Sequence, residues 1–102
     1  MEFLTRMEEI LLLTVHQLEA EAYGVTIKTR VEELLGKSVS VGAVYVPLDR
    51  LAKRGLLKTW QGDPAPERGG RSKKYYKLTR DGLAILRETK KMNDFLWADS
   101  SI

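Results

Sequence analysis

Hydrophobic residues recur at helical spacing over the first part of the chain. The expected apolar stripe consists of Leu4, Met7, Leu11 and Leu18, widened by Ile10, Leu13 and Val15. This spacing predicts a first helix over about 3–20. The stripe is broader than a small domain can cover, so we expect part of this helix to face a partner chain.

A second helix is predicted after Tyr23-Gly24, because the apolar positions again share one helical face. They are Ile27, Val31, Leu34 and Leu35. Gly36 follows them directly, and glycine is the residue that most often closes a helix at its C-terminal end. The second helix is therefore expected to end at Leu35.

The third predicted helix begins after Ser40, a favourable N-cap, and ends at Gly55. Its expected buried stripe is Val41, Val44, Tyr45, Leu48, Leu51 and Ala52. The opposite face presents Gly42, Ala43, Val46, Pro47, Asp49, Arg50, Lys53 and Arg54. Since proline lacks a backbone N–H, we expect Pro47 to kink this helix or to limit regular geometry to the residues after it.

A two-stranded hairpin and a last helix complete the pattern. Leu56–Gln61 and Lys73–Leu78 are predicted strands, and the intervening residues are too rich in glycine and proline for either regular structure. Tyr75 and Tyr76 alternate along the second strand, so one is expected to face the core and the other the basic surface. Thr79 is expected to cap a helix through about Trp97. Its two apolar stripes are Ile85, Thr89, Met92 and Leu96, and Leu83 with Leu86.

Three helices, a hairpin and a final helix are the element order of a winged helix-turn-helix, a mainly α fold with a small β-hairpin (α+β). With 102 residues the chain has room for one compact unit. We expect residues 1–78 to form the DNA-binding part, with the first helix also contributing to dimerisation. Residues 79–102 are expected to form a C-terminal helix within the same unit, with the tail after Trp97 frayed, and the family resemblance given below implies that this is a dimerisation helix.

Positive charge is concentrated in one segment of the chain. Residues 50–80 contain ten basic and two acidic side chains, whereas the flanking segments carry an acidic excess. Such a block is suited to a polyanion such as DNA, although a solvated basic face is the plainer alternative.

The amino-acid composition excludes several common kinds of catalytic site. The chain has no cysteine, and His16 is its only histidine, so neither a thiolate site nor a histidine-based triad is available. Gly69-Gly70 matches neither common nucleotide-binding glycine pattern. We expect a non-enzymatic cytoplasmic protein without metal, cofactor or membrane-spanning segment, and interpret His16 as a partly buried polar residue.

The predicted DNA-binding residues lie on the third helix and in the wing. They are Ser40, Gly42, Ala43, Tyr45, Val46, Arg50, Lys53, Arg54, Arg68, Gly69, Gly70, Arg71, Lys73 and Lys74. The cations are expected near phosphates, and the glycines permit close approach to the duplex. Val46 is either a contact for a thymine methyl group or an ordinary surface valine. Tyr45 is expected mainly in the core, with its hydroxyl near a phosphate.

Several short motifs give the chain a family resemblance. They are Tyr23-Gly24, SVGAVY at 40–45 with Leu48 and Arg50-Leu51, GLL at 55–57, GGRSKKYY at 69–76 and LTRDG at 78–82. In this order and at this spacing the chain resembles the PadR family of winged-helix transcriptional regulators, in a short form similar to the phenolic-acid-responsive repressors, over roughly residues 5–88. Relatives often place proline directly after the tyrosine of the third helix, whereas here Val46 intervenes.

The resemblance implies a dimeric DNA-binding regulator, usually a repressor, whose last helix packs against the first helix of the other subunit. It also implies that a small aromatic or hydrophobic effector enters at the dimer interface, where Phe95 and Trp97 are the aromatic candidates. The expected dimer and effector residues are Leu4, Met7, Leu11, Met92, Phe95, Leu96 and Trp97. Only about twenty residues follow Gly82, so no large separate effector domain is expected.

We therefore predict a homodimeric repressor that blocks a palindromic operator in double-stranded DNA and is released when a ligand changes the spacing of the two reading helices. The alternative is a winged-helix module that binds protein and does not read DNA.

Overall fold

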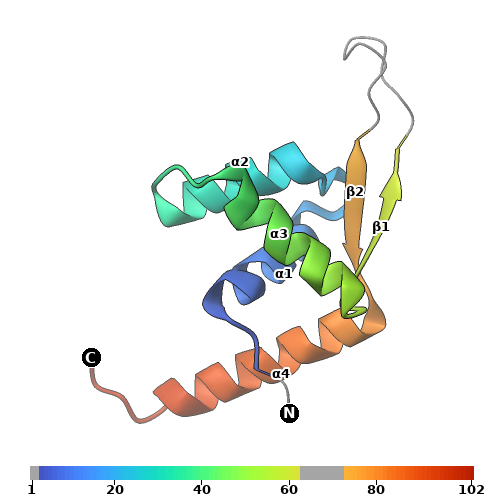
Figure 1. Ribbon diagram of the computed structural model, residues 1–102. Coiled ribbons are helices and arrows are strands. Elements are labelled where there is room, and N and C mark those ends of the chain that lie inside the picture. The colour runs from blue at the N-terminus through green and yellow to red at the C-terminus, as the bar shows by residue number, and fades with distance from the viewer. Residues whose placement is uncertain (1–2, 63–72) are drawn as a thin grey trace.

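The computed structural model describes residues 3–62 and 73–102. Within these residues, four α-helices and one hairpin follow one another in the predicted order, and a short 3-10 helix that was not predicted lies between the first two α-helices (Figure 1). They are α1 (Arg6–Leu18), η1 (Glu19–Glu21), α2 (Gly24–Leu35), α3 (Val41–Lys53), β1 (Leu57–Gln61), β2 (Lys74–Leu78) and α4 (Arg80–Trp97). The element order and types predicted from the sequence are confirmed.

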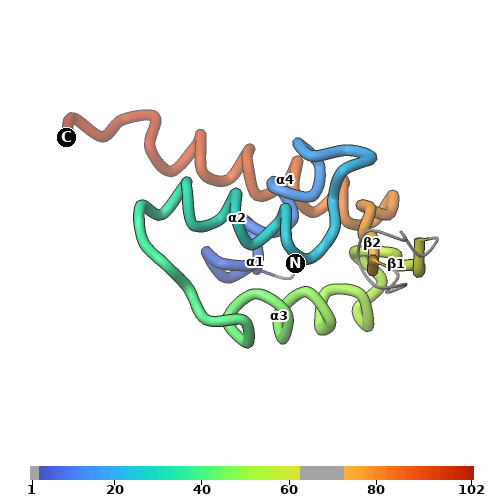
Figure 2. The backbone as a smooth tube through the Cα atoms, turned by 90° about the horizontal axis from the view of Figure 1, so that it is seen from above, coloured from blue at the N-terminus to red at the C-terminus, as the bar shows by residue number. Residues whose placement is uncertain are grey.

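The helices form layers around α1 and α2. Figure 2 shows α3 along one side of the molecule and α4 along the opposite side, with α1 and α2 between them and the hairpin at one end. The strands are antiparallel, with Thr59 opposite Tyr76 and Trp60 opposite Tyr75. This is the winged helix-turn-helix arrangement, in which α3 occupies the position termed the reading helix and the hairpin the position termed the wing.

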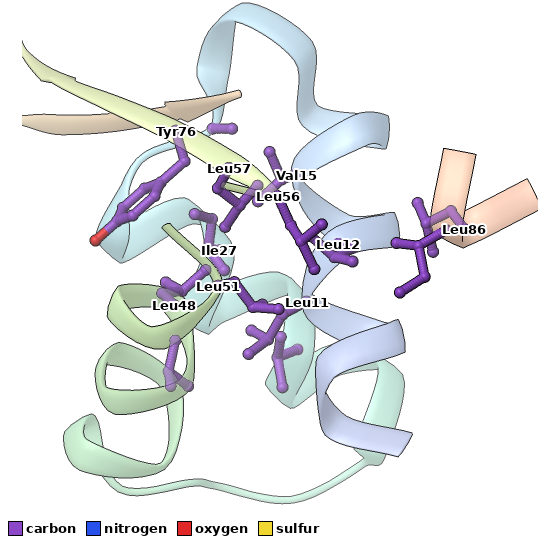
Figure 3. Close-up of a cluster of buried hydrophobic side chains, with 14 residues drawn as sticks. Leu11, Leu12, Val15, Ile27, Leu48, Leu51, Leu56, Leu57, Tyr76 and Leu86 are labelled. Atoms are coloured by element: carbon purple, nitrogen blue, oxygen red, sulfur yellow. The ribbon is translucent and has the colours of Figure 1, made fainter. Parts of the chain in front are cut away.

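One hydrophobic core joins the layers. Leu48 and Leu51 of α3 point toward Leu11 of α1, while Leu86 reaches from α4 toward Leu12 (Figure 3). The hairpin contributes Tyr76, which is almost completely buried, and its N–H donates to the carbonyl of Ala22 at 2.9 Å. The core therefore ties both the reading helix and the wing to α1.

Side-chain and glycine caps define most helix ends. The Thr5 hydroxyl accepts from the Glu8 N–H and the Glu8 carboxylate accepts from the Thr5 N–H, a reciprocal capping box. Ser40 caps α3 by accepting from the Ala43 N–H, and Gly36 ends α2 at φ 69°, in the left-handed region. Thr79 caps α4 through the Gly82 N–H, as predicted.

The structure corrects several local predictions. Helix α1 begins at Arg6 and passes into η1 after Leu18, and each strand starts one residue later than expected. Helix α3 is continuous through Pro47, so the expected restriction to the residues after it was wrong. Pro47 has no N–H to donate to the carbonyl of Ala43. Because Ala43 is exposed, water can donate a hydrogen bond to this carbonyl instead.

Two burial predictions were also wrong. Val41 lies in the first turn of α3 and is 60% exposed, because the helix reaches the core only from Val44 onward. His16 is exposed rather than partly buried, since it lies on the side of α1 turned away from the core. Of Tyr75 and Tyr76, the second is the core residue.

Candidate nucleic-acid interface

The outward face of α3 is the first component of the candidate interface. Val44, Leu48 and Leu51 hold the opposite side of this helix in the core. Gly42, Val46, Arg50 and Lys53 are therefore turned away from the protein, and all four are exposed. They present a small and apolar surface in the first half of α3 and a cationic surface in the second half.

The turn before α3 is held by an acidic side chain of α2. The Glu32 carboxylate accepts from the Val39 N–H at 2.9 Å and from the Lys28 ammonium at 3.2 Å. These two hydrogen bonds lower the pKa of Glu32 from its ordinary value, with the Val39 N–H as the larger cause. Since this carboxylate bridges α2 to the turn, it helps to set the angle at which α3 projects.

Tyr45 lies between the reading helix and α2. It is half-buried, and its ring covers Gly24, where a Cβ atom would overlap the Tyr45 hydroxyl. The predicted core role of Tyr45 therefore holds, and its partner is the glycine of the Tyr23-Gly24 motif. A side chain at position 24 would displace the Tyr45 ring from this place.

The cations of α3 have different surroundings. Arg50 and Lys53 form no ion pair with any residue of 3–62 or 73–102. Arg54, by contrast, pairs with Glu8 of α1 at 3.0 Å, and this carboxylate is largely buried. Arg54 follows the helix as its C-cap and ties α3 to α1, so it stands apart from the two outward cations.

The two lysines at the base of the wing lie on opposite faces of the hairpin. Lys74 pairs with Asp49 of α3 at 3.3 Å, which links the wing to the reading helix. The Lys73 ammonium lies 3.9 Å from the centre of the Tyr23 ring, a cation–π contact on the other face. The remaining predicted wing residues, Arg68, Gly69, Gly70 and Arg71, lie outside the described residues.

Sequence reasoning missed how the aromatic residues of the hairpin are arranged. Trp60 stacks on Tyr75 with ring centroids 5.8 Å apart, and Tyr75 contacts Tyr23 at 5.4 Å. These three aromatic rings stiffen the base of the wing on the hairpin face that is turned away from α3. The sequence signal that could have revealed this arrangement is the alternation of side chains along each strand. It puts Trp60 and Tyr75 on the same face of the hairpin once the strand register is known.

A second candidate surface lies at the end of α4. Met92, Phe95, Leu96 and Trp97 are exposed there, while Leu4 and Met7 of the first helix region are half-buried. Leu11 is completely buried within the chain's own core, so it is not available to a partner and is removed from the predicted interface. No cluster of three or more His, Cys, Asp or Glu side chains suited to a metal occurs among residues 3–62 and 73–102.

The family model described as the "Transcriptional regulator PadR-like family" matches residues 11–88. The chain belongs to this family of transcriptional regulators. A comparison with curated proteins finds no significant match. Within the described ranges, no helix of this PadR-like protein is long and apolar enough to cross a membrane.

Solved structures of similar fold include other regulators of this family. A PadR-like transcriptional regulator from Bacillus cereus is 27% identical with a TM-score of 0.74, over 90% of this chain and 84% of that one. A PadR-like transcription factor from Bacteroides fragilis is 30% identical with a TM-score of 0.73, over 88% and 82%. RosR from H. salinarum is 25% identical with a TM-score of 0.76, over 96% and 81%.

The structure explains two further motif residues of this PadR-like chain. A Cβ atom at Gly82 would overlap the carbonyl oxygen of Leu56, so the glycine of LTRDG allows α4 to start directly against the turn before β1. The second tyrosine of GGRSKKYY, Tyr76, fills the core, and burial together with the nearby Asp49 raises its pKa to about 12. Both residues serve the packing of the fold.

Proposed function

We propose that this PadR-like protein is a homodimeric repressor that binds double-stranded DNA through α3 and the wing. In each protomer α3 would enter the major groove, with the hairpin beside the adjacent phosphates. Two half-sites about one helical turn apart would then form a palindromic operator. Repression would follow from steric block of transcription.

The observation that carries the proposal is the outward face of α3. Arg50 and Lys53 are exposed and unpaired within the described residues, next to a small and apolar first half that contains Gly42 and Val46. Small side chains permit close approach to base edges, and the free cations suit flanking phosphates. The Lys74–Asp49 pair leaves Asp49 less repulsive to a DNA backbone than an unpaired carboxylate would be.

Dimerisation is supported by the far half of α4. The Asn93 amide donates to Glu9 of α1 at 3.0 Å, and beyond this contact the last turn of α4 extends past α1 (Figure 1). Leu96 lies on the same helical face as the buried Ile85 and Thr89, yet it is 68% exposed. A helix face that is buried at one end and exposed to solvent at the other is suited to packing against a second copy of the chain.

The dimer is tested by sedimentation of Leu96→Glu, for which we expect monomers at micromolar concentration. Leu34→Glu is the matched control, because Leu34 is a comparably exposed leucine on α2 and its replacement should leave the dimer intact. A dimeric Leu96→Glu protein would contradict this assignment of the interface.

An effector at the dimer interface is the last element of the proposal. Phe95 and Trp97 are exposed near the end of α4, where they would meet the partner. A ligand between the two protomers would change the spacing of the reading helices and so release the operator.

The DNA proposal is tested by capture of fragmented genomic DNA at about 150 mM salt, where weak surface attraction is screened, followed by sequencing. We expect a few enriched sites that share an inverted repeat. For Arg50→Gln and Lys53→Gln we expect weaker operator binding, and a log–log salt slope reduced by about one for each lost phosphate contact. Lys91→Gln, on the solvent face of α4, is the charge-matched control.

The same capture distinguishes the alternative function. If the recovered DNA is random or absent, and Arg50→Gln changes nothing, the protein does not read DNA specifically. The winged helix would then be a protein-binding module.

A further inference from the structure

Lysines and aromatic rings gather on the face of the hairpin that is turned away from α3. Side chains alternate between the two faces of a strand, and the buried Leu57 and Tyr76 mark the face that packs on the core. The opposite face, which we call the outer wing face, consists of Lys58, Trp60, Lys73, Tyr75 and Lys77, together with Tyr23, which is bridged to Tyr75. None of these six residues is acidic.

Two lysines of the outer wing face stand directly opposite each other. The strand register pairs Lys58 with Lys77, and opposed residues of an antiparallel pair have their Cβ atoms about 5 Å apart. Both are exposed, and their side chains form no ion pair or hydrogen bond with any described residue. Like charges in this position destabilise a sheet, and departures from such local rules are expected at functional sites. An anion held between the two ammonium groups would replace the repulsion by two charge-assisted hydrogen bonds.

An aromatic ring lies beside this lysine pair. Trp60 follows Lys58 by two residues on the same strand face and is 45% exposed. Its indole stacks on Tyr75 with an interplanar angle of 14°, so the ring is held in one orientation while much of it stays accessible to solvent. A fixed flat ring next to cations is the usual platform on which single-stranded nucleic acids stack their bases.

The pattern of cations and rings suits a single strand better than a duplex. Residues on one face of a β-strand recur about every 7 Å, so lysines and rings alternate at roughly the spacing of nucleotides in an extended strand. A duplex stacks its base faces on one another and presents only their edges, so an exposed indole has no base face to meet there. An unpaired strand offers phosphates and base faces together.

We propose that the outer wing face binds single-stranded DNA, with a phosphate between Lys58 and Lys77 and a base stacked on Trp60. DNA is the polyanion that a transcriptional regulator meets, and its strands are separated wherever transcription starts. Stacking and phosphate contacts tolerate any base, so this binding is independent of sequence. The surface lies on the other side of the hairpin from α3, and the proposal does not depend on operator reading by that helix.

The first test measures stacking on the indole. Fluorescence anisotropy follows the binding of the full chain to a labelled oligothymidylate of about twelve nucleotides, and to an unrelated duplex of the same length. We expect Trp60→Ala to weaken binding of the single strand about fivefold or more and to leave duplex binding unchanged. Trp60→Phe keeps a flat ring and should retain most of the affinity. Circular dichroism checks that each variant is folded.

The second test addresses the opposed lysines. Each phosphate contact contributes about 0.7 to the log–log salt slope for a single strand, so Lys58→Gln/Lys77→Gln should reduce this slope by about 1.4. Because the same change removes a repulsive pair, the thermal midpoint of the free protein should not fall. Lys37→Gln/Lys91→Gln, with equal loss of charge at exposed positions elsewhere, should keep the slope.

Several outcomes would overturn the proposal. They are no binding of the oligothymidylate by the wild type, an unchanged salt slope in Lys58→Gln/Lys77→Gln, and an equal effect of Trp60→Ala on strand and duplex. Loss of strand binding in Arg50→Gln/Lys53→Gln, with the hairpin variants unaffected, would place the strand on α3 instead. An oligouridylate that bound more tightly than the oligothymidylate would contradict DNA as the occupant of this face.

Discussion

Replacement of Gly82 by alanine tests how closely α4 docks on the rest of the fold. A Cβ atom there would overlap the Leu56 carbonyl oxygen, and it would lie 3.0 Å from the Leu56 carbonyl carbon and 3.1 Å from a methyl of Leu78. Relief requires the start of α4 to move away from this turn. That movement lengthens the hydrogen bonds from the Thr79 N–H to Leu56 (3.1 Å) and from the Thr79 hydroxyl to Gly55 (2.6 Å).

The magnitude follows from these opposing effects. Overpacking costs about 1–3 kcal/mol, and each weakened hydrogen bond about 1 kcal/mol. Alanine recovers about 1 kcal/mol through its higher helix propensity. We therefore expect Gly82→Ala to lower the free energy of unfolding by about 2–4 kcal/mol, which corresponds to a fall of about 10–30 °C in the thermal midpoint.

The chain provides a control of the same chemistry. Gly42 also lies in the first turn of a helix, but no atom lies within 4 Å of a Cβ built on it. Gly42→Ala should stabilise the protein by about 0.5–1 kcal/mol. Urea unfolding followed by circular dichroism, at one fixed protein concentration, measures both variants. A Gly82→Ala protein as stable as the wild type would refute the close approach of α4 to Leu56.

Three further predictions concern single side chains. The Thr14 hydroxyl is buried without a hydrogen-bond partner among residues 3–62 and 73–102, so Thr14→Val should stabilise the protein by about 1 kcal/mol in urea unfolding; a loss of stability would indicate a partner for this hydroxyl. Glu19→Gly should relieve the strain at φ 50° and stabilise by about 1 kcal/mol, and an unchanged midpoint would argue against that strain. The pKa of Tyr76 is raised to about 12, which favours its neutral form in the folded state. Its contribution to stability is complete below pH 10 and is lost as the pH rises toward 12, so Tyr76→Phe should reduce the loss of stability measured across this interval.

Local signals in the sequence were sufficient to predict the helices and strands. The caps Ser40 and Thr79 act through N–H groups three residues away, and Gly36 ends α2 within its own turn. Such interactions depend on neighbours in the chain, and helical periodicity likewise depends on residues three and four apart. For this reason the helix ends that these residues define were predicted to the residue, whereas α1, predicted over about 3–20, is shorter at both ends. The order of elements predicted the winged helix-turn-helix.

The candidate site was predictable only in part. The exposure of Arg50 and Lys53 followed from the helical position of the buried stripe. The surroundings of Arg54 did not, because its partner Glu8 is 46 residues away in the sequence. Similarly, the pairing of Lys74 with Asp49 spans 25 residues and depends on how the hairpin meets α3.

The sequence by itself determined the element order, the helix ends, the basic segment and the family, because each of these rests on local pattern or on motif order. Only the tertiary structure decided which cations remain free, since pairing requires side chains from distant elements to meet. It also decided that Leu11 belongs to the chain's own core and that Tyr23 joins the hairpin beside Tyr75. Both depend on how elements pack in three dimensions, which periodicity along one helix or strand does not encode.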